Sequence, residues 1–517
     1  MFQKIEKLLY RIVEKLENQK IGLTGWLAGF FSVVFLRIFL EIFSTQRNDL
    51  LSTEWDFFFF HTPIFYLSEI LIFILFAYFL TKEKIEKISR LALFGTFLIL
   101  LPPILDLVFS SAELGIPTRY REIPPGTSLL GLPKLFFGWM TIGPFGLFFE
   151  GKPDFSLSYF ESNFGGRIVV LSIAIIFLWY VFLKTKNILK VIFGLFLLYL
   201  SGFIISTFPY IFSVILKTPP APGSFLNNVS VINPSFEEDK ILFSLFFILT
   251  VFLAVLWFYI YNKKKCLAVL KNLKPVLALQ NLAMLGFGIY LCKIPLQSFT
   301  FFDGLLITGA CLSLLLYQFS GGKFLGEESK NINNILRAAS FISAFIVGYA
   351  FFVLLFLRAL IAHIYFTPPF YLKRFPIIAS FLLALVFLLT IFLGYLLNTS
   401  NSILTFPKNL ALFILIAFTF GFTAKDIKNY ERDKKEKVYT MPVIFGQRQG
   451  KIIIGFLIFF VFLLTPFFFF QHFNELILPS ILAGILSFWL LNRKEYREKP
   501  LFLIYFSYGL FFTLTLF

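Results

Sequence analysis

The residues with the clearest chemical potential lie at 425–446, KDIKNYERDKKEKVYTMPVIFG, where acidic and basic side chains alternate directly after an apolar run. On a helix, Asp426, Asn429 and Asp433 occupy positions i, i+3 and i+7, so they project from one face, whereas Glu431 points elsewhere. Carboxylate and amide oxygens suit Mg²⁺, which typically takes one or two protein carboxylates together with phosphate oxygens and water. The spacing therefore predicts a magnesium site that a diphosphate would complete.

A charged segment beside an apolar run is more often only a solvated turn at the cytoplasmic membrane face. The ordered spacing of the acidic residues, and the T-x-P-V-x-x-G tail at 440–446, argue against that simpler interpretation. A second basic pair, Lys373 and Arg374, is explained equally well by membrane topology and by binding of an anion. Both interpretations of this pair stay open.

The composition explains which elements must position these side chains. Hydrophobic residues make up 58% of the 517-residue chain, the mean hydropathy is +0.83, and apolar runs of about 20 residues recur throughout, long enough to span a membrane. This pattern predicts an all-α, polytopic integral membrane protein. The net charge of +17 is then expected to mark cytoplasmic loops, with no nucleic-acid partner.

The apolar runs predict about fifteen transmembrane helices in two parts. Residues 1–262 form an N-terminal membrane domain with about six spans and no assigned function, residues 263–274 form a basic linker, and residues 275–517 hold about nine spans. The segment 332–367 is predicted as two short helices rather than one long one. Basic loops place the N-terminus and the acidic segment on the cytoplasmic side, and residues 1–20 are predicted to form an interfacial helix.

The ordered motif at 425–446 closely resembles the second aspartate-rich motif of the UbiA superfamily of intramembrane prenyltransferases, K-D-x-x-D-x-E-G-D-K-x-x-G-x-x-T-L-P-V-x-x-G. A second segment, YFTPPFYLKRFP at 365–376, resembles the family's Y-S-x-P-P-x-R-x-K-R-x-P sequence. The resemblance covers about residues 270–517, and the predicted spans of this half agree with the family's nine-helix fold.

The chain departs from the family pattern within and outside this motif. Asn429 stands in place of an aspartate, and Arg432 and Lys437 stand in place of glycines. The family's first motif, N-D-x-x-D-x-x-x-D, is largely missing: Ser320 and Lys323 take its aspartate positions. Glu327 or Glu328 is the carboxylate left for the third aspartate's role.

The resemblance implies transfer of a prenyl group from a polyprenyl diphosphate to an aromatic, quinone-type or lipid acceptor at the cytoplasmic face, with Mg²⁺ as cofactor and membrane lipids around the site. The residues that it implies are the catalytic set Asp426, Asp433, Asn429 and Glu431, the diphosphate-binding set Lys373, Arg374, Lys434 and Tyr365, and the metal ligands Asp426, Asp433 and Glu327. Lys323, which departs from the family pattern, is expected to join the diphosphate-binding set as a point charge for phosphate.

Two other functions remain open. The degraded first motif favours a catalytically inactive relative that binds or transports a lipid diphosphate. In the N-terminal half, Asp49, Glu54 and Asp56 follow an apolar span, a placement that resembles the catalytic carboxylates of membrane glycosyltransferases that use lipid-linked sugars.

Overall fold

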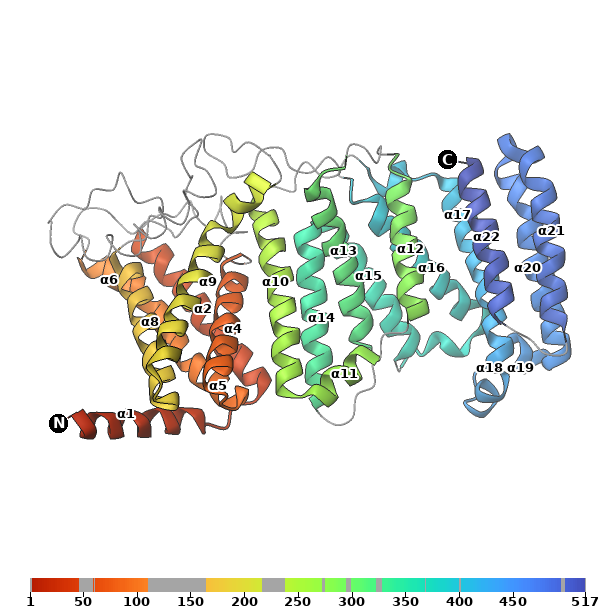
Figure 1. Cartoon of the computed structure of the whole chain (residues 1–517). Helices are drawn as coiled ribbons and strands as arrows, with labels where there is room; N and C mark the ends of the chain where they lie inside the picture. The colour runs from red at the N-terminus through yellow and green to blue at the C-terminus, as the bar shows by residue number, and fades with distance from the viewer. Residues whose placement is uncertain are drawn as a thin grey trace. The chain divides into compact units, whose positions relative to one another are not determined.

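A computed structural model shows a helical, polytopic membrane protein, with no strand among the residues that it describes (Figure 1). These residues are 2–45, 59, 61–109, 164–215, 238–271, 275–293, 299–321, 328–367, 369–398, 401–493 and 498–516. Within them, eleven helices are long and apolar enough to cross a membrane, or up to twelve if one bent pair is counted as a span. The predicted fold class is confirmed, whereas the predicted count of fifteen spans is not.

The chain divides into two compact units. The first comprises Met1–Leu273, Thr300–Gly309 and Phe319–Arg337, and the second comprises Lys274–Phe299, Ala310–Gln318 and Ala338–Phe517. Helices α13 (Phe301–Phe319) and α14 (Glu328–Val347) contribute residues to both units. The functional division that was placed at residues 263–274 stays a prediction.

The first unit is built mainly from apolar helices, because backbone N–H and C=O groups in hydrocarbon must bond within their own segment. These elements are α1 (Phe2–Glu17), α2 (Leu23–Thr45), α4 (Thr62–Thr81), α5 (Ile85–Gly95), η2 (Thr96–Leu100), α6 (Leu101–Phe109), α8 (Phe164–Thr185), α9 (Ile188–Ile215), α10 (Glu238–Tyr261) and α11 (Lys263–Lys271).

Helix α1 lies crosswise at the ends of the other helices of this unit (Figure 1). Its last residue, Glu17, is buried and accepts hydrogen bonds from Lys184 Nζ at 2.8 Å and from the Tyr180 hydroxyl at 3.0 Å. Leu8 and Ile12 of α1 are about half exposed, at 58% and 46%. An amphipathic helix fixed in this orientation fits the predicted interfacial position.

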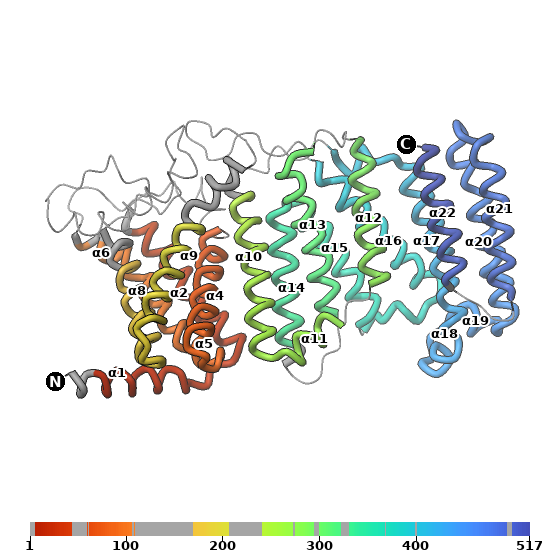
Figure 2. Tube along the Cα trace, in the orientation of Figure 1, coloured from red at the N-terminus to blue at the C-terminus, as the bar shows by residue number. Residues whose placement is uncertain are grey.

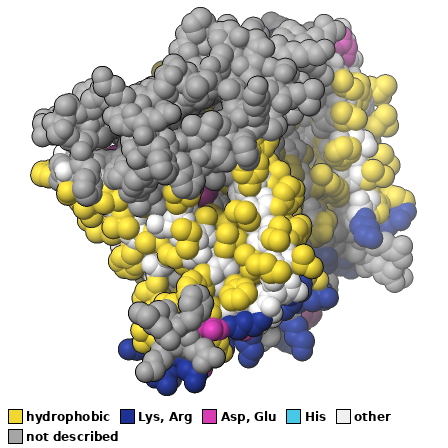
Figure 3. Space-filling view, turned by 60° about the vertical axis from the view of Figure 1, so that its left-hand side comes forward, with side chains coloured by type: hydrophobic (Ala, Val, Ile, Leu, Met, Phe, Trp, Pro, Cys, Tyr) yellow, Lys and Arg dark blue, Asp and Glu magenta, His cyan; other side chains and the backbone are white. Residues whose placement is uncertain are grey.

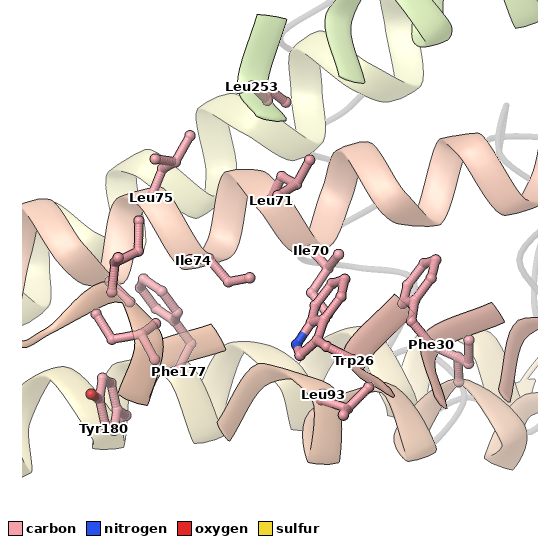
Figure 4. Packing of buried hydrophobic residues seen from close by; sticks show 14 of the residues in the cluster. Trp26, Phe30, Ile70, Leu71, Ile74, Leu75, Leu93, Phe177, Tyr180 and Leu253 are labelled. Carbon is pink, nitrogen blue, oxygen red and sulfur yellow. The ribbon is translucent and has the colours of Figure 1, made fainter. Parts of the chain in front are cut away.

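The core of the first unit is an apolar cluster that includes Trp26 (Figure 4), and the partly buried Trp257 packs against it. Trp26 Nε1 donates to the Ser89 carbonyl at 2.7 Å, and Trp257 Nε1 donates to the Ser89 hydroxyl at 2.9 Å. Since indole N–H groups need an acceptor when they are buried, Ser89 joins α2, α5 and α10 at one point. On the outside, hydrophobic side chains cover the visible helices, and Lys and Arg gather at the lower edge (Figure 3).

The second unit contains α12 (Pro275–Tyr290), α15 (Tyr349–Phe366), η5 (Leu372–Arg374), α16 (Pro376–Tyr395), η6 (Ile403–Thr405), α17 (Lys408–Phe422), α18 (Ala424–Lys435), α19 (Met441–Phe445), α20 (Gln447–Phe468), η7 (Phe470–His472), α21 (Phe473–Asn492) and α22 (Glu498–Leu516). The helical segment from α14 to α15 is interrupted at Gly348. The segment therefore holds two helices as predicted, and of these two only α15 meets the length and composition of a membrane span.

Two glycines bring α12 and α16 into backbone contact. A Cβ atom on Gly288 would lie 2.0 Å from the carbonyl oxygen of Ile391, and one on Gly394 would lie 2.1 Å from that of Leu285. Small residues are favoured between membrane helices because close approach there gains packing contacts that lipid does not supply. The glycine pair therefore fixes the distance between these two helices.

We expect Gly288→Ala to destabilise the protein by about 1–3 kcal/mol, because the methyl group would force the two helices apart. The control is Gly286→Ala on the same helix, where an added Cβ would meet no atom within 4 Å. Thermal unfolding of the purified variants in detergent measures the difference, and equal unfolding temperatures for the two variants would contradict the expected role of Gly288.

Candidate active site

The acidic motif forms the short helix α18, which continues from α17 after a bend of 44° (Figure 2). With charged side chains in every turn, α18 is suited to the membrane surface rather than to the hydrocarbon. Asp433 is 3% exposed and Asp426 and Asn429 are half-buried, whereas Glu431 is exposed. The shared helical face predicted for Asp426, Asn429 and Asp433 therefore exists.

The end of α18 is fixed by a pair of backbone hydrogen bonds characteristic of a Schellman motif. The N–H of Val438 donates to the Asp433 carbonyl at 2.8 Å, and the N–H of Lys437 donates to the Lys434 carbonyl at 3.4 Å. This motif requires a left-handed residue, and Lys437 supplies it with φ of 54°. The family's glycine at this position now has a physical reason: glycine adopts that conformation without a Cβ clash.

The tail of the motif turns the chain from α18 into α20. Pro442 lies in the first turn of α19, where a missing backbone N–H is tolerated. Gly446 has φ of 83°, which favours glycine, and joins α19 to α20. A Cβ atom on Gly450 would lie 2.6 Å from the Cα of Pro442, so Gly450 lets α20 pack directly against α19.

The second predicted motif lies beside this tail. The N–H of Tyr439 donates to the Arg374 carbonyl at 3.2 Å, and Lys373 Nζ lies 3.2 Å from Glu436 Oε2. These contacts join η5 to α18 and its tail across more than sixty residues of sequence, since Lys373 and Glu436 are 63 positions apart. Two segments that the sequence singled out separately therefore lie side by side.

The electrostatics of α18 oppose full ionisation of its two inward carboxylates. Burial, and secondarily the nearby Asp433 carboxylate, raise the pKa of Asp426 from 3.8 to about 7, although Lys425 and Lys373 act in the opposite direction. Burial also raises the pKa of Asp433, and Arg432 and Lys373 partly offset the effect. Tyr365 at the end of α15 is buried and close enough to interact electrostatically with both aspartates.

The residues at α18 fit a divalent cation held mainly by phosphate oxygens and water. Asp433 Oδ1 is buried without a hydrogen-bond donor, and its nearest ionic partner is Arg432 Nη2 at 3.7 Å. An added cation would satisfy this oxygen and offset the repulsion between Asp433 and Asp426. Within the described part of the chain, no group of three or more acidic, histidine or cysteine side chains could hold a metal ion.

The remaining predicted residues are placed differently. The exposed Arg374 guanidinium stacks over the Tyr371 ring, 4.9 Å from its centroid, and Lys434 Nζ lies 5.8 Å from the centroid of Tyr430. Lys323 and Glu327 lie outside the described residues. The side chain of Glu436, which pairs with Lys373, was missed because its charge looked like any other in the loop.

The fold and the site define a helical membrane protein with a paired-aspartate motif where α17 continues into α18. A sequence model of the UbiA prenyltransferase family matches residues 322–513, the C-terminal part of the chain, and confirms the resemblance stated above. The match supports an intramembrane function of the prenyltransferase type. No curated protein and no solved structure matches the chain.

Replacing Lys437 by glycine is expected to stabilise the protein by about 0.5–1 kcal/mol, because a left-handed non-glycine residue costs about 1–2 kcal/mol and glycine gives back part of that through greater freedom in the unfolded chain. Lys435→Gly provides the comparison, since Lys435 has helical geometry and should lose about 1 kcal/mol. Thermal unfolding of both variants tests the left-handed conformation assigned to Lys437. That assignment is wrong if both variants are destabilised to the same extent.

The raised pKa of Asp426 predicts how stability depends on pH. Because the folded state binds this proton more tightly than the unfolded chain does, stability should fall as the pH rises from about 4 to about 7. Asp426→Asn should weaken that dependence. The measurement is the unfolding temperature of the metal-free protein between pH 5 and pH 8, and an unchanged slope in the variant would exclude Asp426 as a source.

Proposed function

We propose that the C-terminal half, residues 275–517, transfers a prenyl group from a polyprenyl diphosphate to a lipophilic acceptor, with Mg²⁺ as cofactor. The observation that carries the proposal is the contact between the two motifs, in which Lys373 of η5 lies 3.2 Å from Glu436 at the end of the helix that bears Asp426 and Asp433. A cation-binding carboxylate pair beside a lysine is the arrangement that a diphosphate requires.

In this mechanism, Asp426 and Asp433 would hold the cation, and Lys373 would turn from Glu436 to pair with the diphosphate. Mg²⁺ supplies charge neutralisation for the departing diphosphate. The bond from the first prenyl carbon to its oxygen breaks, the electron pair leaves with the diphosphate, and an allylic cation remains. Its capture by a nucleophilic acceptor atom forms the new bond and releases a proton.

Tyr365 is positioned to stabilise the allylic cation. It is 8% exposed and interacts electrostatically with both aspartates, so its ring lies near the place where the diphosphate would leave. An aromatic face attracts a cation within about 6 Å of its centroid. Of the other tyrosines near the motif, Tyr439 is 57% exposed, Tyr430 faces Lys434 and Tyr371 faces Arg374, which makes Tyr365 the best placed.

Topology follows from the same assignment. The charged helix α18 and the basic η5 turn would face the cytoplasm, and the N-terminal membrane domain would accompany the catalytic half.

The missing aspartates of the first motif favour a second candidate function, in which the site binds a lipid diphosphate without cleaving it. Asp49 and Asp56, on which the glycosyltransferase alternative depends, lie outside the described residues.

Mg²⁺-dependent release of pyrophosphate from farnesyl or geranylgeranyl diphosphate tests the proposal. We expect Asp426→Asn and Asp433→Asn each to lower the rate at least about a hundredfold, because each removes charge that holds the cation at the leaving group. The purified full-length protein is assayed with a mixed pool of acceptors.

The matched control is Glu475→Gln, the same change from carboxylate to amide in the first turn of α21, where Glu475 bonds to His472 at 3.0 Å. This variant should retain the wild-type rate. Diphosphate binding without any release would support the binding-only function, and release that does not need the two aspartates would refute the proposed site.

A further inference from the structure

An arginine lies buried within a membrane-spanning helix of the second unit. Arg358, near the middle of α15, is 7% exposed, and α15 meets the length and composition of a membrane span. A charged side chain at such a position is costly, so it ordinarily has a partner of opposite charge or a functional role. Sequence reasoning missed Arg358 because it stands alone in an apolar run.

The partners of Arg358 are polar but uncharged. Its Nη2 donates to Asn281 Oδ1 at 3.0 Å, and its Nε donates to the Thr390 hydroxyl at 3.2 Å. Its guanidinium carbon lies 5.8 Å from the centroid of the Tyr317 ring. No carboxylate in the described ranges lies within ion-pair distance, so the positive charge is oriented by three helices but not neutralised.

Arg358 also stands in a defined relation to the proposed site. It precedes Tyr365 by seven residues on the same helix, so both side chains lie on one face of α15, about 10 Å apart along the axis. Leu354, Leu355 and Ile361 are buried on the same side. A molecule that reaches from the diphosphate site along this face into the membrane would meet the guanidinium.

The charge of Arg358 has a consequence for the chemistry. An unneutralised guanidinium on the same helix face as Tyr365 would repel an allylic cation beside that ring and oppose ionisation of the donor. A bound anion would remove that repulsion and bring negative charge toward the developing cation. Guanidinium N–H groups not used by Asn281 and Thr390 remain available to such an anion, since arginine has a fork of donors that matches carboxylate and phosphate oxygens.

We propose that Arg358 binds the anionic group, a carboxylate or a phosphate, of the lipophilic acceptor and thereby selects acidic acceptors. This inference rests on the proposed function, and it assigns the substrate class. Asn281 and Thr390 are positioning residues that orient the guanidinium. Tyr317 packs against the same group.

The test is equilibrium binding to the purified full-length protein in detergent, without Mg²⁺ or prenyl donor. The probes are two matched pairs: 4-butylbenzoate with its methyl ester, and 4-butylphenyl phosphate with 4-butylphenol. We expect the wild type to prefer the anionic member of at least one pair by about tenfold or more, as for a charge-assisted hydrogen-bonded pair. The pair that shows the preference distinguishes a carboxylate from a phosphate.

Arg358→Gln should abolish this preference. Arg493→Gln is the matched control, because Arg493 is exposed and stacks on Trp489 at the end of α21. Lys373→Gln should keep the preference, which separates Arg358 from the diphosphate site. If Arg358→Gln does not fold, the test uses Arg358→Lys, which keeps the positive charge but lacks the planar fork of N–H donors. This variant must still weaken the preference for the anionic probe.

Absence of a preference in both pairs, or a preference that survives in Arg358→Gln or depends on Lys373 instead, would overturn the proposal. Because binding is measured without the donor, these outcomes are independent of pyrophosphate release. A protein that discriminates through Arg358 but releases no pyrophosphate would refute the prenyltransferase function and leave the anion site standing.

Discussion

The candidate site depends on holding two carboxylates together where burial disfavours their charge. Asp426 and Asp433 project from one face of α18, and the pKa of each is raised chiefly because water is excluded around it. Lys373, which approaches from η5, partly offsets this effect at both residues. The two carboxylates therefore need further positive charge beside them. The proposed binding of Mg²⁺ together with a diphosphate would supply that charge.

The rest of the motif serves to fix the ends of this arrangement. The Schellman motif at Lys437 ends α18 directly after Asp433, and the left-handed turn at Gly446 starts α20. The hydrogen bond from Tyr439 to Arg374 then joins the tail to η5. These residues could be taken for a simple loop between two spans, but they determine where the carboxylates lie. Each of them restricts the backbone at a position that side-chain packing alone would leave variable.

Inside the membrane-spanning helices, different rules govern which residues matter. The contact between α12 and α16 depends on Gly288 and Gly394, which remove side chains so that backbones can touch. On the same helix α12, Asn281 orients Arg358 of α15. A polar group buried in a membrane-spanning helix has a much larger energetic effect than one at the surface, which is the physical basis for the role proposed for Arg358.

The sequence by itself determined the helical membrane fold, the break near Gly348 and the face shared by Asp426 and Asp433, because hydropathy and helical periodicity are local properties of the chain. Only the tertiary structure decided that Lys373, rather than its neighbour Arg374, approaches the aspartates, and that Arg358 is buried among uncharged partners. These outcomes depend on contacts between residues far apart in sequence, and neither composition nor spacing encodes which side chains meet across helices.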